Sequence, residues 1–325
     1  MNMHEWRRQV ISSRKTLNIP VMTHPGIDAI GHTVKEAITD GGIQAKAICY
    51  LADHYPTDAA CVVMDLTVEA EAFGADVVFP EDEIASVTGR LLQDVADIEA
   101  LKVPSLEAGR IREYLRANII ASRHIQDRPL LAGCIGPFSL AGRLYGMSEI
   151  MMLMYSEPQA THLLLQKCTD FLLKYCKALK ATGANGVLMA EPAAGLLSDD
   201  DCRQFSSRYV RQIVERVQDE SFMLVLHNCG NTGHCTKAMV ETGADAYHFG
   251  NKCVMAEVMH DLPSDKLGMG NLDPVSVLKE GTPESIRAAR EALLESCREF
   301  PNFILSSGCD TPPHTPLENI DAMFY

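Results

Sequence analysis

The 325-residue chain is long enough for one large α/β domain, and its composition is that of a folded globular protein. Hydrophobic residues make up 46% of it and charged residues 22%, which excludes a disordered chain. Its formal net charge of -14 argues against nucleic acid or an anionic membrane as a partner, because both attract basic surfaces. The sequence contains neither a signal-peptide pattern nor a membrane-spanning apolar run, so we expect a cytoplasmic protein.

Apolar runs rich in Val, Ile, Leu and Met alternate with longer amphipathic stretches, a pattern typical of repeated βα units around a parallel sheet. In chain order, the expected strands are 19–23, 61–65, 130–135, 186–190, 222–227, 245–249, 267–271 and 303–307. The clearest expected helices are 107–123, 158–182, 199–218 and 283–299. This order predicts an α/β fold, a single (β/α)8 TIM barrel over residues 1–325 with an N-terminal helical extension.

Local signals support these boundaries. Ser198 and Asp199 offer side-chain oxygens to cap one helix, and Thr282 followed by Pro283 begins another. A Gly-Ala pair recurs at 74–75, 183–184 and 243–244, each time between a helical stretch and an apolar run, where glycine ends a helix easily. The polar segment 80–106, with Thr88-Gly89 as a turn, is the expected insertion.

The eleven cysteines do not suggest a disulfide framework. Their number is odd, and most lie inside apolar segments, as Cys61, Cys134 and Cys168 do. We therefore expect most of them to be reduced core thiols.

Metal-binding side chains follow two of the expected strands. The run 222–226 leads into His227-Asn228-Cys229-Gly230, and side chains two apart on an extended chain point the same way. The run 303–307 leads to Cys309, so all three donors fall at strand carboxyl ends, where barrels carry their chemistry. One imidazole and two thiolates are typical zinc ligands, and three protein ligands leave a fourth position for substrate. An H-x-C pair also arises by chance, and Cys309 could equally be a buried thiol.

Other polar residues end strands at the same expected mouth. Glu191 is interpreted as a fourth ligand or a base, or alternatively as a carboxylate bonded to loop amides. Asp273 is a further catalytic candidate, although it could instead cap the following helix, and Asn271 is a candidate substrate contact. The histidines at strand ends or top loops are interpreted as pocket walls or structural residues, and the first two as substrate contacts: His24, His248 and His314.

The chain resembles the uroporphyrinogen decarboxylase superfamily over nearly its whole length. The segments that carry the resemblance are 68–75 (VEAEAFGA), 136–141 (GPFSLA), Glu191-Pro192, 227–230 (HNCG), 270–274 (GNLDP), 307–309 (SGC), Pro316 and Glu318-Asn319. Within it, His227, Cys229 and Cys309 match the zinc ligands of the corrinoid-dependent thiol methyltransferases, the branch that includes the methylcobamide:coenzyme M methyltransferases. The decarboxylases carry arginines near the N-terminus for substrate carboxylates, whereas the segment 22–28 here has none.

The resemblance implies transfer of a methyl group from a corrinoid (methylcobamide), carried on a corrinoid-binding partner protein, to a small thiol activated on zinc. Two alternatives stay open. One is a decarboxylase of a small or cyclic carboxylate, which would need no metal and several basic groups. The other is a non-catalytic module that binds the corrinoid protein, with structural zinc held by four protein ligands. The sequence does not identify the thiol, and Arg143 is a candidate anion contact or a surface residue.

Overall fold

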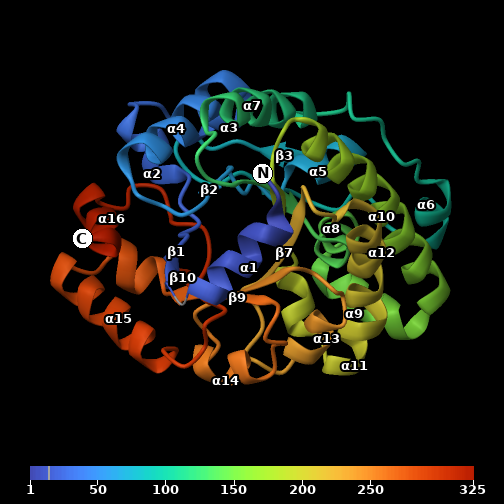
Figure 1. Cartoon of the computed structure of the whole chain (residues 1–325). Helices are drawn as coiled ribbons and strands as arrows, with labels where there is room; N and C mark the ends of the chain where they lie inside the picture. Colours follow the sequence, from blue (N-terminus) through green and yellow to red (C-terminus); the bar gives the residue numbers. More distant parts are fainter. Residues whose placement is uncertain (14) are drawn as a thin grey trace.

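A computed structural model describes residues 1–13 and 15–325, and its main sheet curls into a barrel (Figure 1). All neighbouring strands in this sheet are parallel. Their spatial order is β1 (Leu17–Asn18), β10 (Phe303–Ser307), β9 (Leu267–Leu272), β8 (Ala246–Phe249), β7 (Met223–Asn228), β6 (Gly186–Ala190), β5 (Leu130–Ile135) and β2 (Ala60–Cys61). The backbone N–H of Asp58 donates to the carbonyl of Asn18 at 3.1 Å, which links the two end strands and confirms the expected (β/α)8 barrel.

Helices surround the sheet, as Figure 1 shows. In chain order they are α1 (Met3–Ser13), α2 (His24–Ala29), α3 (Val34–Thr39), α4 (Gly41–His54), α5 (Val68–Phe73), α6 (Val95–Ala100), α7 (Ile111–His124), α8 (Pro137–Tyr145), α9 (Met147–Ser156), α10 (Pro158–Ala181), α11 (Asp199–Cys202), α12 (Arg208–Val217), α13 (Thr236–Val240), α14 (Met255–His260), α15 (Pro283–Ser296) and α16 (Leu317–Phe324). A 3₁₀-helix, η1 (Pro192–Leu196), and two π-helices, η2 (Arg203–Ser207) and η3 (Pro274–Lys279), complete the set.

The first two strands are shorter than the sequence indicates. We expected strands over 19–23 and 61–65, whereas the regular ladders cover Leu17–Asn18 and Ala60–Cys61. Pro20 has no N–H to continue the ladder, and the N–H of Val21 bonds to the side chain of Ser307 at 3.0 Å instead of to backbone. A side-chain hydrogen bond therefore replaces the ladder where the chain after β1 reaches the mouth of the barrel.

The expected helix over 199–218 is divided. The Ser198 side chain caps α11 as predicted, by accepting from the N–H of Asp201, but the π-helix η2 separates α11 from α12. Thr282 also caps its helix as predicted, within a capping box that includes Ser285.

Residues 80–106, the expected insertion, contribute no strand to the main sheet. The strands β3 (Val77–Val78) and β4 (Ser86–Val87) pair as an antiparallel hairpin, and α6 follows them. The tip of the hairpin lies between residues 78 and 86, and the chain bends at Gly89 (φ 66°) just after β4, where the sequence indicated a turn.

The N-terminal helix closes one end of the barrel. In Figure 1, α1 crosses the barrel opening that faces the viewer. Its Met3 and Val10 belong to the same buried cluster as Leu188, Val225 and Ile304 of the strands. Helix α1 therefore packs against the interior side chains at the amino ends of the strands and leaves the carboxyl ends, where TIM barrels carry their active sites, open to the other side.

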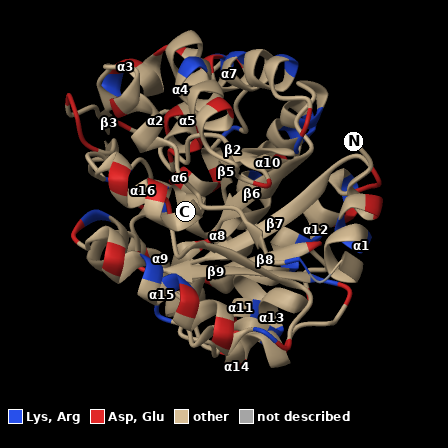
Figure 2. Ribbon diagram, turned by 60° about the vertical axis from the view of Figure 1, so that its left-hand side comes forward, with Lys and Arg blue, Asp and Glu red and all other residues tan. Residues whose placement is uncertain are grey.

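Charge is distributed over the helices and loops around the barrel, while the strands are mostly uncharged (Figure 2). The described helices include none with the length and apolarity needed to cross a membrane. All eleven cysteines are free thiols, and all but Cys49, Cys229 and Cys309 are buried.

The packing of α1 predicts a stability effect. Met3 is 1% exposed, so Met3→Ala should lower the free energy of unfolding by about 2–4 kcal/mol, through lost burial and a cavity beneath the strands. Urea denaturation followed by circular dichroism measures this. Met152→Ala, at a residue that is 64% exposed on α9, is the matched control and should change stability by less than about 0.5 kcal/mol. Equal effects of the two changes would contradict the role of α1.

Candidate metal centre

Three potential metal ligands meet at the carboxyl end of the barrel. His227 lies near the end of β7, Cys229 directly follows β7, and Cys309 follows β10. One ligand atom from each lies within 4.8 Å of the others, although Cys309 is 80 residues or more away in sequence. The structure therefore brings together the three residues that the sequence singled out.

Glycines let the loops around this site approach one another. A Cβ atom on Gly250 would lie 2.6 Å from Cα of Cys229, and a Cβ atom on Gly308 would lie 2.7 Å from the backbone nitrogen of Asn251. Both distances are shorter than real Cβ contacts. Only glycine leaves room for the segments after β7, β8 and β10 to converge.

A chain of buried hydrogen bonds leads to His227. The hydroxyl of Ser306 donates to the carbonyl of Ile19 at 2.7 Å, and Nε2 of His248 lies 2.9 Å from the same hydroxyl oxygen. Nδ1 of His248 lies 2.6 Å from Nδ1 of His227. Each of the two imidazoles is at most 1% exposed.

The direction of each bond in this chain follows from chemistry. A carbonyl only accepts, so the Ser306 hydroxyl uses its proton on Ile19 and must accept from Nε2–H of His248. Burial, together with the neighbouring His227, holds the pKa of His248 well below its usual range, so the ring is neutral and its Nδ1 accepts from Nδ1–H of His227. Nε2 of His227 is then left with a free lone pair.

That lone pair has no hydrogen-bond partner in residues 1–13 and 15–325. Among the described residues, Nε2 of His227 is a buried polar atom without a hydrogen bond. Such an atom is costly to bury, and a metal ion is the partner that a neutral imidazole nitrogen beside two thiols would take. The donor set of one nitrogen and two sulfur atoms suits a borderline-soft metal ion such as zinc.

Each of the two thiols at the site changes the pKa of the other. The hydrogen bond with Cys309 lowers the pKa of Cys229 to about 7, against the opposing effect of burial. The same bond raises the pKa of Cys309. A thiolate is the form in which either cysteine would bind a metal ion.

Glu191 occupies a different position from the one expected of a fourth ligand or base. Its carboxylate accepts from the backbone N–H groups of Phe138 at 2.7 Å and Ser139 at 2.8 Å, and from the hydroxyl of Ser206 at 3.1 Å. Gly136 leaves the space that it fills, since a Cβ atom there would lie 2.5 Å from its carboxyl carbon. The geometry matches the alternative interpretation, a carboxylate bonded to amides at the N-terminus of α8.

The structure also corrects three expected contacts. His248 has both ring nitrogens engaged within the protein, so it is placed to orient His227 rather than to touch a substrate. Asn271 donates to the carbonyls of Gly250 and Cys253 at 2.9 and 2.8 Å, which orders the loop after β8. The carboxylate of Asp273 caps η3, the alternative that the sequence left open.

His24 lies next to the loop that carries Cys309. Its Nδ1 lies 3.1 Å from the carbonyl of Thr311 and 3.4 Å from Asp310. Burial of the ring works to lower the pKa of His24, but the hydrogen bonds and the negative charge of Asp310 outweigh it and raise the pKa. His24 remains a candidate substrate contact, whereas His314 lies in an exposed cluster with two carboxylates.

Sequence reasoning missed Ser306 and Glu69. Ser306 is one of two serines that end an apolar strand, which signals an interior hydrogen bond only once its neighbours are known. Glu69 lies in a segment used only as a family marker, yet it is 1% exposed and has one oxygen bonded to the N–H of Ile135 at 3.0 Å and the other unpartnered. Burial raises the pKa of Glu69 to about 8.

Comparisons with known proteins agree on one family. The family model "Uroporphyrinogen decarboxylase (URO-D)" matches residues 17–325. Methylcobamide:CoM methyltransferase MtbA of Methanosarcina mazei is 30% identical over 270 residues, 82% of this chain and 78% of the relative. Uroporphyrinogen decarboxylase of Legionella pneumophila is 29% identical over 276 residues, 83% of this chain and 78% of the relative.

A solved structure shares the fold. A methyltransferase from Methanosarcina mazei superimposes with a TM-score of 0.88 at 24% sequence identity, over 98% of this chain and 96% of the other. At that identity the match supports the barrel and its topology.

The hydrogen-bond chain predicts that Ser306 acts through His248 on metal affinity. Ser306→Ala removes the acceptor that fixes the His248 tautomer, so the His227 lone pair is no longer enforced. Binding of a divalent metal should weaken about 10- to 100-fold, measured by competition with a chromophoric chelator. Ser307→Ala is the matched control, because the side chain of Ser307 bonds to the backbone of Val21 and to neither histidine. Equal affinities of both variants and the native protein would contradict the relay.

The buried carboxyl group of Glu69 should make the free energy of unfolding depend on pH. Its pKa rises from 4.5 in the unfolded chain to about 8 in the folded protein, so folding favours the protonated form. Its contribution is complete below pH 4.5 and is lost as the pH rises toward 8, at up to about 1.4 kcal/mol per pH unit. Glu69→Gln should flatten urea-denaturation profiles over this range. Glu291→Gln, at an exposed carboxylate on α15, controls for net charge, and an unchanged slope in Glu69→Gln would refute the assignment.

Proposed function

Because the chain belongs to the uroporphyrinogen decarboxylase family, we propose that it is the methyltransferase kind of member rather than a decarboxylase. It moves a methyl group from a methylated corrinoid, carried by a corrinoid-binding partner protein, to a small thiol held on zinc. His227, Cys229 and Cys309 are the zinc ligands in this proposal. Relatives named methylcobamide:CoM methyltransferases support the methyl transfer, and the donor set supports the metal.

One observation carries the proposal: the buried, unpartnered Nε2 of His227 beside two thiols. In a decarboxylase without metal, this nitrogen would be an uncompensated polar atom in the active site. With a metal ligated there, every polar group of the hydrogen-bond chain from Ile19 to His227 has a partner.

Zinc bound by these ligands would lower the pKa of an incoming thiol, so that the thiol gives its proton to solvent and becomes a nucleophile for the methyl group. The protein's own residues do the rest. His248 keeps Nδ1–H of His227 engaged, so that Nε2 is the nitrogen left for a metal ion. The cluster offers three protein ligands, so a four-coordinate zinc ion held by them would leave one position for the substrate sulfur. Alignment of that sulfur with the methyl group of the corrinoid is then a problem of orientation.

The alternatives predict different surroundings. Structural zinc requires a fourth protein ligand, and Glu191, the sequence candidate for one, is bonded to α8 instead. A decarboxylase needs several free basic groups, but the buried Arg110 is paired with Asp65 and Glu71, each at 2.6 Å. Neither alternative is favoured by a specific feature of the described residues.

Metal analysis tests the proposal. The purified protein should contain about one zinc ion per chain by mass spectrometry, and the double variant His227→Ala, Cys309→Ala should lose it because one ligand of three cannot hold the ion. Cys297→Ala removes a buried thiol at the C-terminal end of α15, away from the cluster, and this variant should retain the zinc. Retention of zinc by the double variant, or its absence from the native protein, would refute the assignment.

The same preparations test catalysis. With methylcobalamin as donor and a panel of thiols that includes coenzyme M and homocysteine, the native protein and Cys297→Ala should form the methylated thiol, and the double variant should not. Zinc binding without methyl transfer to any thiol, even with a corrinoid-binding partner protein supplied, would favour the structural-zinc module.

A further inference from the structure

The three proposed metal ligands are held in place by different kinds of bonds. His227 lies inside the parallel ladder that β7 forms with β6 and β8. Cys309 follows Gly308, whose N–H donates to the backbone carbonyl of Leu272 at 2.6 Å. Cys229 comes after the end of its strand, and within residues 1–13 and 15–325 neither it nor the next two residues make a backbone-to-backbone hydrogen bond. The position of the Cys229 thiol therefore depends on side chains.

The side chain of Asn228 closes the turn that contains Cys229. Its Oδ1 accepts from the backbone N–H groups of Gly230 and Asn231, each at 3.0 Å. An Asn side chain that bonds to the backbone two residues ahead takes the place of a backbone turn. Side chains alternate along an extended chain, so Asn228 faces away from the side shared by His227 and Cys229. Asn228 can therefore fix the turn without being a ligand.

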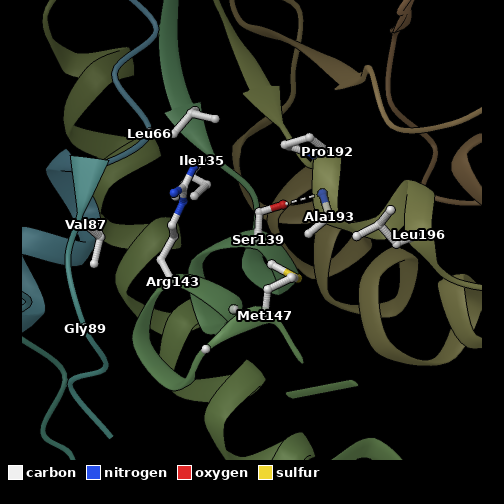
Figure 3. A pocket seen from close by; sticks show the side chains of 12 residues that line it. Leu66, Val87, Gly89, Ile135, Ser139, Arg143, Met147, Pro192, Ala193 and Leu196 are labelled. Atoms are coloured by element: carbon white, nitrogen blue, oxygen red, sulfur yellow. Dashed lines mark hydrogen bonds between the residues drawn. The ribbon is translucent and has the colours of Figure 1, made fainter. Parts of the chain in front are cut away.

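The 3₁₀-helix η1 is the surface against which this turn packs. A Cβ atom on Gly195 of η1 would lie 2.7 Å from Oδ1 of Asn228 and would also clash with the backbone nitrogen of Asn231. On its other face η1 is bonded to α8, since the N–H of Ala193 donates to the hydroxyl of Ser139 at 3.1 Å (Figure 3). That face borders a cavity of about 410 Å³. The turn thus rests on an element that has its own anchor.

The thiol of Cys253 holds the other end of the turn. It donates to the carbonyl of Asn231 at 2.9 Å. Burial raises the pKa of Cys253 to about 11, so the thiol keeps its proton and remains a donor at neutral pH. The backbone carbonyl of Cys253 accepts in turn from Nδ2 of Asn271 at 2.8 Å. These bonds connect β9, the loop after β8 and the turn after β7.

We propose that Asn228 and Cys253 are positioning residues, which hold the thiol of Cys229 ready for a metal ion. This inference rests on the metal site of the proposed function. A turn that is ordered before the ion arrives lowers the entropic cost of binding, so loss of either bond weakens metal binding. In this role both residues act through the backbone of the turn and not as ligands.

Substitution of Asn228 tests the first bond. Asn228→Leu keeps the approximate volume but removes the acceptor, whereas Asn228→Asp keeps an acceptor oxygen in the same position. Cobalt(II) is the probe, because its absorption spectrum reports both the coordination geometry and the number of bound thiolates. Asn228→Leu should bind cobalt about 10- to 100-fold more weakly and lose sulfur-to-metal charge-transfer intensity, and Asn228→Asp should recover both.

A second pair of variants tests the bond from Cys253. Cys253→Ala removes the donor, and Cys253→Ser keeps a donor on a side chain of similar shape. Cys253→Ala should weaken cobalt binding about 2- to 10-fold, the effect of one neutral hydrogen bond, and Cys253→Ser should restore it at least in part. Cys297→Ala also removes a buried thiol and should bind cobalt as the native protein does.

Asn302→Leu separates positioning from a general loss of stability. Asn302 is 4% exposed and donates to the carbonyl of Lys266 at 2.7 Å. Both residues precede the amino ends of their strands, β10 and β9, so they lie at the opposite end of the barrel from the metal centre. Asn302→Leu should unfold at a lower temperature and keep the native cobalt affinity and spectrum.

The outcomes distinguish this inference from the function on which it rests. If the native protein binds neither cobalt nor zinc, the proposed function fails and the positioning role fails with it. If the native protein, Asn228→Leu and Cys253→Ala all bind cobalt equally tightly, the metal centre stands and the positioning role is refuted. An equal loss of affinity in Asn302→Leu, or no recovery in Asn228→Asp, would also overturn it, because the effect would then not come from the bonds to the turn.

Discussion

The hydrogen bond between Nδ1 of His227 and Nδ1 of His248 is the interaction on which the site depends. The two Nδ1 atoms are too close for both to carry a proton, so the hydrogen bond between them holds one. The hydrogen bond of His248 with Ser306 determines which of the two rings carries that proton. The bonds connect β7, β8, β10 and the segment after β1, which is four of the eight barrel strands. The tautomer of His227, the proposed metal ligand, is therefore set by the register of the barrel itself.

This dependence explains why apolar and polar side chains occupy different levels along the barrel axis. Helix α1 fills the amino end with apolar side chains, and the interior above it is apolar as far as Val225 and Ile304. Polar groups begin with the Ser306–His248–His227 chain, just where the strands end. Because these groups satisfy one another except at a single nitrogen, the polar layer adds little unpaired surface to the core and presents one lone pair to the mouth.

The sequence predicted what depends on local patterns. Apolar runs located the six strands from β5 to β10, and the rule that barrel chemistry follows strand ends selected His227, Cys229 and Cys309. It could not predict what depends on pairing between distant segments. His248 and Ser306 are 58 residues apart, and each alone is compatible with a substrate contact or an ordinary strand residue. Glu191 likewise meets its amide partners only because β6 and α8 adjoin.

The groups that activate a thiol differ from the groups that select which thiol binds. A metal ion bound through sulfur activates any thiol that reaches it, so nothing in the three-ligand centre distinguishes one thiol from another. Discrimination must come from groups that contact the rest of the substrate molecule. Since η1 contacts the Cys229 loop and also lines a neighbouring cavity, a shift of this one element would alter the surroundings of both.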